Sequence, residues 1–405
     1  MRLRIKIILL LFFISTSFIC AQAQLKIYQI DVNTGDAALI VSPTNKYILI
    51  DAGDDRHSYG DTVLRFLQNL GITHLDNIIV SHYHEDHIGG MPRVIYGLSG
   101  SGHNDSILGW CYDRGDTYTT SMFINYKNAV GSKRRTIGLG ETLDLGGGAF
   151  MFCVVRNGKV MNGDSVLPNS GENYRSLVWI LKYGLFKFYT GGDLVGANVS
   201  GERDVETKAA PVIRNVHVIK VNHHGSGNSS NNLFLDSLRP AAAIISQGTD
   251  PVNNNHPHQE ALDRLAAHNA YIYQMNNNPT GGTIPAGHGR RLNTTVIVSV
   301  YNTYYTINGD TYTINPNGIE WDESSHIPAN SQNFQSATIK LYNISGRLLR
   351  TRLIQRPADN ILKSSKDWFN NLSSGIYFLR ISGIPLDKQS SEILSVRKIV
   401  ILPRY

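Results

Sequence analysis

Cysteine is scarce in this sequence, and no two cysteines are spaced as C-x-x-C. Three occur in 405 residues, and Cys20 lies close to the N-terminus, which leaves Cys111 and Cys153. Structural zinc sites built from thiols need closely spaced cysteines, so a site of that class is not expected. An exported protein could join Cys111 to Cys153, and two free buried thiols fit the sequence equally well.

Long apolar runs are absent after the N-terminus. Three basic residues and the apolar run 7–13 precede Ala21-Gln22-Ala23, so residues 1–23 are predicted to be a secretory signal peptide, cleaved before Gln24. No later run approaches the roughly 20 apolar residues of a membrane-spanning helix, so no stable transmembrane segment is expected after cleavage. The residues before Cys20 make a poor lipobox, which argues against a lipid anchor.

Basic charge is also scarce where a nucleic-acid-binding surface would need it. The whole chain carries a formal net charge of +6. Residues 1–23 supply three basic residues and 335–405 supply twelve against four acidic ones, which leaves 23 basic and 28 acidic residues in 24–334. The central region is therefore mildly acidic, and a broad nucleic-acid-binding face is not expected. Its one compact basic run, residues 133–135, is more typical of a solvated loop than of a phosphate clamp.

The densest polar motif is the run from Ser81 to His87, with the spacing H-x-H-x-D-H. Neutral imidazole and carboxylate ligands suit Zn²⁺ and the neighbouring first-row metals. An apolar strand pattern precedes the motif, and side chains of an extended chain alternate, so His82 and His84 are expected to point the same way. Asp86 and His87 are then expected in the following loop, where the chain can bend toward a second ion.

Further candidate ligands follow two other strand patterns. Asp193 comes just after the apolar run 185–189, at a place where its carboxylate could bridge two ions. The pair His223-His224 follows the strand-like run 216–221. One of these two imidazoles is expected to be a ligand, and His223 is favoured. Each of these signals is weak alone, but their ordered combination predicts a metal site.

These segments resemble the metallo-β-lactamase superfamily and, within it, the extracellular hydrolase domain of ComEC-type competence proteins. The resemblance covers roughly residues 25–315 and is carried by six segments: Asp31–Ala37, Leu49–Gly53, Val80–Gly90, Thr190–Asp193, Lys220–Ser226 and Pro240–His258. It implies an α+β chain with an αββα sandwich and a dinuclear metal site at one edge. We accordingly expect a hydrolase domain over residues 24–315.

The resemblance also implies a role for each candidate ligand. His82 and His84 would hold the first ion, Asp86, His87 and His223 the second, and Asp193 would bridge the two. The two divalent ions would be zinc or manganese. Asp51 resembles an acidic residue that braces the ligand loops. Many family members have a further histidine where this chain has Asn173, so the first ion is expected to have fewer protein ligands.

The expected chemistry is hydrolysis. Two divalent ions lower the pKa of a bound water, and Asp86 would orient that water or accept its proton. His258 is the candidate proton donor to the leaving group and His256 its competitor, although a loop histidine that caps backbone carbonyls is as common.

Three classes of function fit these residues. The ComEC resemblance favours a secreted phosphodiesterase or nuclease, with DNA as the leading substrate. The acidic central region favours a small or neutral substrate, such as a lactone, an amide or a choline-phosphate ester. A catalytically inactive surface binding protein is the third class, and the intact set of ligands argues against it.

The chain changes character near its C-terminal end. Residues 294–305 and 310–314 alternate around Asn308-Gly309, which predicts a closing hairpin, and residues 316–334 form a polar linker. Four β patterns within 335–405 then predict a small antiparallel β-sandwich that resembles the sorting domain of the type IX secretion system. It lacks the usual Pro-Asn-Pro opening, and a carbohydrate-binding sandwich is the alternative. The sequence thus predicts a secreted or cell-surface protein whose partner is the type IX machinery.

Overall fold

A computed structural model describes residues 24–55, 59–199, 201–248 and 255–314, and the backbone of four further strands. The predicted signal peptide, and the predicted linker up to residue 333, lie outside the described residues. No helix in the described part of the chain is long and apolar enough to cross a membrane.

The first sheet combines strands from both ends of the predicted hydrolase domain. Its strands are β1 (Leu25–Gln29), β2 (Ala38–Val41), β3 (Tyr47–Ile50), β4 (Asn77–Ile79), β5 (Cys111–Asp113), β6 (Arg134–Thr136), β16 (Val296–Val300), β17 (Tyr304–Ile307) and β18 (Asp310–Thr313). Their order is β18-β17-β16-β1-β2-β3-β4-β5-β6. Pairing is antiparallel from β18 to β3 and parallel from β3 to β6.

The second sheet comes from the middle of the chain. Its strands are β7 (Thr142–Gly146), β8 (Ala149–Arg156), β9 (Lys159–Val160), β10 (Val178–Tyr183), β11 (Phe186–Thr190), β12 (Val218–Lys220), β13 (Ala242–Ile245), β14 (Tyr271–Gln274) and β15 (Gly289–Arg291). Their order is β15-β14-β13-β12-β11-β10-β8-β7, with β9 paired to β8. Strands β11 to β15 run parallel, so the segments that carry polar residues after them emerge at one edge.

A hydrophobic core separates the two sheets. Alternation along β3 sends Ile48 and Ile50 into this core and Leu49 to the opposite face. In β13, Ile244 likewise faces the core between the sheets, whereas Ile245 packs on the far side. Burying one aliphatic side chain of this size stabilises the fold by about 1.5–3 kcal/mol. The alternation lets each sheet bury both of its faces.

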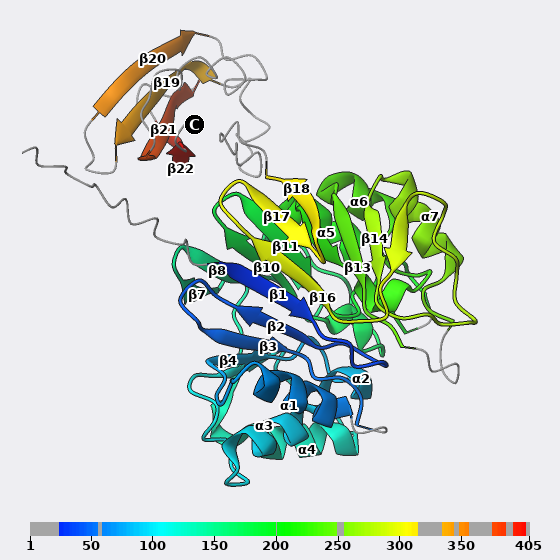
Figure 1. Cartoon of the computed structure of the whole chain (residues 1–405). Helices are drawn as coiled ribbons and strands as arrows, with labels where there is room; N and C mark the ends of the chain where they lie inside the picture. The colour runs from blue at the N-terminus through cyan, green and yellow to red at the C-terminus, as the bar shows by residue number, and fades with distance from the viewer. Residues whose placement is uncertain are drawn as a thin grey trace, which may run out of the picture.

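Helices cover the two outer faces, as Figure 1 shows. The described helices are α1 (Tyr59–Asn69), α2 (Glu85–Ile88), α3 (Met91–Ser99), α4 (Ser121–Val130), α5 (Glu206–Ile213), α6 (Asn232–Leu238) and α7 (Gln259–Ala267). Residues of α1, α3 and α4 join one outer core, and residues of α5, α6 and α7 join the other. This arrangement confirms the αββα sandwich predicted from the sequence.

Local predictions differ from the structure at two places. Asp86 and His87 lie in the one-turn helix α2, not in a loop as expected. Residues 294–305 do not form one strand, because β16 ends at Val300 and a turn separates it from β17. The predicted turn is found at Asn308-Gly309, which joins β17 to β18 with positive φ at both residues.

The C-terminal strands form a sheet of their own. They are β19 (Phe334–Asn343), β20 (Leu348–Gln355), β21 (Gly375–Pro385) and β22 (Glu392–Ile401). They pair antiparallel in the order β20-β19-β21-β22. Each falls on one of the four predicted β patterns, and the residues between them lie outside the described part of the chain.

The two cysteines left open by the sequence are free thiols. Cys111 on β5 and Cys153 on β8 are both buried and unbridged. They belong to different cores, since Cys111 packs under the helices of the first sheet and Cys153 lies between the sheets. Burial raises the pKa of the Cys153 thiol to about 12, so both cysteines act as small apolar residues.

Candidate metal centre

Candidate ligands from both sheets meet beyond the ends of the strands. The motif around His82 follows β4, Asp193 follows β11, and the His223-His224 pair follows β12. Of the seven residues predicted for the site, six lie in this cluster and His258 lies outside it. Strand ends that meet at one edge are the usual place for a site in sheets with parallel strands.

The first group of ligand atoms contains His82, His84 and Asp193. One atom from each lies within 4.8 Å of the others. His82 Nε2 is 3.1 Å from His84 Nδ1 and 3.9 Å from Asp193 Oδ2. Between them, Tyr83 points the other way into the outer core. The expectation that alternate side chains converge is therefore met, although strand β4 itself already ends at Ile79.

The second group surrounds the other oxygen of Asp193. Asp193 Oδ1 lies 3.2 Å from His87 Nε2 and 3.4 Å from His224 Nε2. Asp86 Oδ2 lies 3.1 Å from the same His224 nitrogen and 3.7 Å from His87 Nε2. The two oxygens of one carboxylate thus face two separate groups, as a bridging ligand would.

Hydrogen bonds fix the orientation of the histidine rings in this centre. His224 Nδ1 lies 2.8 Å from the carbonyl oxygen of Ser246, which can only accept, so this nitrogen carries the proton. His87 Nδ1 lies 2.9 Å from Asp51 Oδ2, a carboxylate oxygen that accepts, so this nitrogen also carries the proton. In the neutral ring, the lone pair is then left on Nε2, which points into the second group. Such a brace is typical of histidines that bind metals.

The atoms at the centre of the second group lack partners of their own. In the neutral tautomers with the ring proton on Nδ1, His87 Nε2, His224 Nε2 and Asp193 Oδ1 are buried and form no hydrogen bond. Buried polar atoms in native structures are nearly always satisfied, and an unsatisfied one often marks a missing ion or water. Two imidazole nitrogens and carboxylate oxygens are a donor set suited to Zn²⁺ or Mn²⁺. The residues therefore fit a metal ion.

Burial and charge perturb these groups strongly. Burial alone would lower the pKa of the His224 imidazole, but the carboxylates of Asp193, Asp36 and Asp86 outweigh it and raise that pKa to about 10. Burial lowers the pKa of His82 well below its usual value, with the nearby charge of His87 acting in the same direction. The protein without metal thus holds protons at positions that an ion would occupy, and binding would release them.

The structure changes the position expected for His223. The sequence interpretation placed His223 beside Asp86 and His87, but His224 occupies that place. His223 Nε2 instead lies 3.7 Å from Asp193 Oδ2 and 3.4 Å from Asn173 Nδ2, on the side of the first group. The cause is local, because His223 and His224 both adopt left-handed backbone (φ 49° and 53°), which directs neighbouring rings to different sides.

That backbone conformation is itself informative. Each left-handed non-glycine residue costs about 1–3 kcal/mol, and such strain collects at functional sites. The two residues lie in a short 3-10 turn (Asn222–Gly225) directly after β12. Asn222 is held by Tyr189 Oη and by Glu206 Oε1 at 2.9 and 2.7 Å. Buried hydrogen bonds therefore keep the strained turn in place.

Two further residues at the centre were not predicted from the sequence. Asp36 is grouped with His87, Asp193 and His224, and its carboxylate forms an ion pair with the buried ammonium of Lys220. Lys220 also donates to the carbonyl oxygen of Gly192 over 2.9 Å. A lysine is rarely so buried unless it is paired. The signal for both was present, since each lies in a segment that carries the family resemblance.

The two candidate proton donors lie at different depths. The ring of His256 lies 5.2 Å from that of His223 and is buried. His258 is the residue directly before α7, and its ring lies 4.8 Å from that of His256. The backbone N–H of Gly227 donates to His258 Nδ1 over 2.9 Å, so neutral His258 carries its proton on Nε2. His256 is thus adjacent to the ligand cluster, and His258 lies one ring further out.

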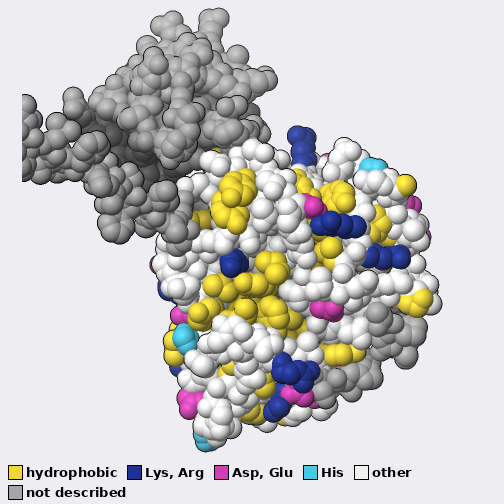
Figure 2. Space-filling model, viewed as in Figure 1, with side chains coloured by type: hydrophobic (Ala, Val, Ile, Leu, Met, Phe, Trp, Pro, Cys, Tyr) yellow, Lys and Arg dark blue, Asp and Glu magenta, His cyan; other side chains and the backbone are white. Residues whose placement is uncertain are grey.

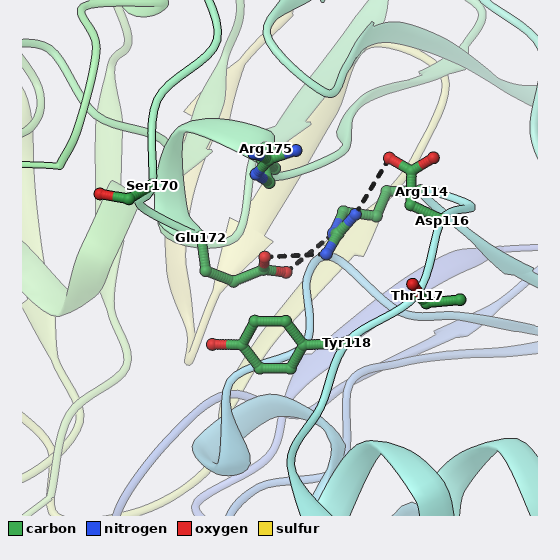
Figure 3. A pocket seen from close by; sticks show the side chains of 7 residues that line it. All are labelled: Arg114, Asp116, Thr117, Tyr118, Ser170, Glu172 and Arg175. Carbon is green, nitrogen blue, oxygen red and sulfur yellow. Dashed lines mark hydrogen bonds and ion pairs between the residues drawn. The ribbon is translucent and has the colours of Figure 1, made fainter.

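A pocket of about 600 Å³ lies next to the motif that supplies the first group. Its lining includes Glu172, whose Oε1 accepts the backbone N–H of Tyr83 over 2.9 Å. Figure 3 shows the paired Arg114 and Glu172 side chains, with Arg175 and Tyr118 on opposite sides of the pair. No sequence pattern indicated this pocket, because its walls come from segments about 60 residues apart, as in the Arg114–Glu172 pair.

Known protein families match two regions of this chain. The family described as anti-Pycsar protein Apyc1 matches residues 29–99, which include Asp36, Asp51 and the motif from His82 to His87. The secretion system C-terminal sorting domain matches residues 322–401. The boundaries predicted from the sequence stay predictions, since neither match tests them.

Two curated proteins are similar over much of this chain. ComE operon protein 3 (ComEC) of Bacillus subtilis is 27% identical over 307 residues, which are 70% of this chain and 36% of that protein. Recombination protein 2 of Haemophilus influenzae is 27% identical over 240 residues, 58% of this chain and 26% of that protein. This chain therefore spans about a third or less of either relative's length.

Among solved structures, the metallo-β-lactamase fold protein YhfI from Bacillus subtilis is similar, with a TM-score of 0.41 and 11% identity over 68% of this chain and 100% of that one. The αββα sandwich of this chain is the arrangement that the resemblance to the metallo-β-lactamase superfamily implied, and the chain is distantly homologous to ComE operon protein 3. It carries a C-terminal secretion sorting domain, which indicates a secreted or cell-surface protein.

Proposed function

We propose that this protein is a secreted, dinuclear-metal-dependent phosphodiesterase, with DNA as its leading substrate. The observation that carries the proposal is the pair of ligand groups that share the carboxylate of Asp193. His82 and His84 face one of its oxygens, and His87 and His224 face the other. An inactive binding protein would have no reason to keep both groups buried and braced.

The proposed ligands follow from the geometry. His82, His84 and Asp193 would hold the first ion, with His223 adjacent. Asp86, His87, Asp193 and His224 would hold the second. Zinc and manganese both suit this donor set. When bound, such ions lower the pKa of a water and polarise a phosphoryl oxygen.

The chain's own residues supply the remaining functions. Asp86 is the one carboxylate of the cluster that is partly exposed (26%), so it can orient the attacking water and accept its proton. His258 presents an N–H at Nε2 and would donate a proton to the leaving oxygen. Lys220 and Asp51 do not reach substrate in this scheme, because both are buried beneath the ligands and hold them in place.

The relation to ComEC supports a phosphodiester substrate, and surface charge limits how that substrate is bound. Residues 24–334 carry five more acidic than basic residues. On the face shown in Figure 2, Lys and Arg side chains are scattered and form no continuous stripe. Few phosphate contacts imply weak binding that falls as salt rises, with a shallow slope because the slope scales with the number of contacts. We also expect little sequence preference.

The test is a metal assay followed by a substrate panel. The mature protein should bind about two divalent ions, and the loaded protein should hydrolyse single- or double-stranded DNA and bis(p-nitrophenyl) phosphate. His84→Ala should abolish activity while circular dichroism stays unchanged, because the cores do not include the ligands. His103→Ala is the matched control, since His103 is exposed and outside both ligand groups.

Two outcomes would contradict the proposal. A metal-free wild type together with a fully active His84→Ala variant would remove the metal mechanism. Turnover of a lactone, an amide or a choline-phosphate ester, with no phosphodiester cleaved, would move the protein to the alternative class of hydrolase.

A further inference from the structure

The pocket beside the first ligand group contains one cation that no carboxylate neutralises. Arg114 is paired through two bonds of 2.8 Å with Glu172, and both side chains are buried. Arg175 donates instead to two backbone carbonyl oxygens, those of Gly171 and Asn169, at 3.0 and 2.9 Å. Among the described residues no carboxylate lies within ion-pair distance of Arg175. Its guanidinium also lies over the ring of Tyr174, 5.0 Å from the centroid, so its positive charge is held in place but not offset by a carboxylate.

An aromatic ring completes the pocket. Tyr118 is half-buried, and its ring packs against Phe123 and Tyr83 at centroid distances of 6.5 and 6.1 Å. Figure 3 shows it on the opposite side of the Arg114–Glu172 pair from Arg175. A ring fixed by neighbouring aromatics presents a flat apolar surface at low entropic cost. Such a ring is a platform on which a planar base can stack.

The pocket is also joined directly to the candidate metal centre. Tyr83 stands between His82 and His84, and its N–H donates to Glu172 in the pocket wall. Asn173, the next residue, contacts His223 across the same wall. The volume of about 600 Å³ is in the range that binds small molecules. A ligand in this pocket would therefore be linked, through Glu172 and the backbone of Tyr83, to the segment that carries the first pair of imidazoles.

We propose that this pocket is the subsite for the nucleotide next to the scissile phosphodiester, with Arg175 on that nucleotide's own phosphate and Tyr118 stacked on its base. The inference rests on the proposed function, since it assigns a nucleotide to a neighbouring substrate position. It accounts for substrate capture by a domain of net negative charge, because the contacts are concentrated in one pocket. It also predicts that a nucleoside next to the cleaved bond improves turnover.

The kinetic test compares esters that share one leaving group. The nucleotide substrates are thymidine 3′-phosphate 5′-(p-nitrophenyl phosphate) and its 5′-phosphate 3′-(p-nitrophenyl phosphate) isomer, and the reference is methyl p-nitrophenyl phosphate. Wild type should prefer at least one thymidine ester in kcat/KM. Arg175→Gln should lower that preference about tenfold or more through loss of a charge-assisted bond. Tyr118→Ala should lower it about tenfold, whereas Tyr118→Phe should retain it.

Arg175 also bonds the loop that contains it, so a structural effect must be separated from a binding effect. A disturbed loop would lower kcat/KM for the methyl ester and the thymidine esters in parallel and leave the preference unchanged, which would overturn the inference. The matched control is Arg65→Gln on α1, because Arg65 is exposed and, within the described part of the chain, bonds only Thr62 of its own helix. This control should keep the wild-type preference.

A binding measurement distinguishes failure of this subsite from failure of the proposed function. Thymidine 3′,5′-bisphosphate is titrated into the full-length protein by calorimetry, with inorganic phosphate as the reference ligand. Binding that weakens about tenfold in Arg175→Gln and Tyr118→Ala supports the pocket even if no phosphodiester is cleaved. Cleavage of DNA together with unchanged bisphosphate binding in both variants rejects the pocket and leaves the proposed function standing.

Discussion

Asp51 Oδ2 and His87 Nδ1 are joined by a hydrogen bond of 2.9 Å between two buried side chains. The other oxygen of Asp51 accepts the backbone N–H of Ser81 over 2.8 Å. One carboxylate therefore holds both ends of the motif that supplies the imidazoles. Asp51 adopts a left-handed backbone (φ 55°), a conformation that aspartate tolerates better than most residues.

Replacing this brace should weaken metal binding without unfolding the protein. We expect Asp51→Asn to lower metal affinity about 10–100-fold, because the amide cannot accept both hydrogen bonds as a carboxylate does. The measurement is competition with a chelator of known affinity. Asp105→Asn, on an exposed loop, is the control. An unchanged affinity in Asp51→Asn would show that the brace is dispensable.

The two adjacent histidines should have different effects on metal content. His224→Ala should reduce the bound metal from about two ions to about one, because His224 faces Asp86 and His87 in the second group. His223→Ala should keep the second ion, and any loss should come from the first. Elemental analysis of purified variants gives the stoichiometry, and turnover of His224→Ala should fall more than roughly 100-fold, beyond the effect of an outer brace. Loss of the second ion in His223→Ala, with both ions kept in His224→Ala, would restore the sequence-based assignment of His223 to the second ion.

His258→Ala should slow turnover by roughly 10²–10⁴-fold and leave the metal in place, as expected for loss of a general acid. The physical reason is that Gly227 N–H occupies Nδ1 and leaves the proton on Nε2. His256→Ala is the comparison, because His256 lies between His258 and the cluster. A larger loss in His256→Ala, with His258→Ala near wild type, would transfer the role to His256.

Gly35 provides a test of how closely the backbone approaches the site. Gly35 has φ 98°, and a Cβ there would overlap the carbonyl oxygen of Asp86. Gly35→Ala should displace Asp86 and lower both activity and stability, by about 2 kcal/mol or more in unfolding free energy. Gly71 also has a positive φ (73°) but open space around it. Gly71→Ala should therefore cost only about 1 kcal/mol and keep full activity. Stability is measured by denaturant titration and activity by turnover. Equal losses in Gly35→Ala and Gly71→Ala would show that the close backbone approach at Gly35 does not matter.

Residues 335–405 should be required for delivery to the cell surface. The sorting-domain match supports this, and we propose that the receiving machinery is the type IX system. Deletion of 335–405 should trap the protein in the periplasm with its metal-dependent activity intact, since the ligands all lie before residue 225. Fractionation and surface proteolysis measure the outcome. Surface appearance of the deletion variant would refute the assignment.

Much of the fold was predictable because local pattern and burial agree. The strands before His82, Asp193 and His223 are short apolar runs whose alternate residues fill two cores, and polar residues follow each run. Strand ends therefore indicated where ligands would gather. The same logic could not separate β16 from β17, because their alternation continues through a short turn that has no glycine or proline.

The finer geometry depended on contacts that no sequence window contains. The choice between His223 and His224 rests on two consecutive left-handed residues, a conformation that side-chain identity does not predict. The bond from Tyr83 to Glu172 spans 89 positions, and the ion pair of Lys220 with Asp36 joins a strand of the second sheet to the segment before β2 in the first. Tertiary structure alone brings such partners together.

Tyr83 links the candidate metal centre to the neighbouring pocket. Its neighbours in the chain carry the first pair of imidazoles, while its N–H and ring contact Glu172 and Arg114 in the pocket wall. A shift at either place can be transmitted through this residue, in addition to the contact of Asn173 with His223. Binding equilibria coupled in this way are reciprocal. If a ligand in the pocket raises the affinity for the ion by some factor, the bound ion raises the affinity for that ligand by the same factor. Substrate binding by this protein would then depend on whether its metal ions are bound.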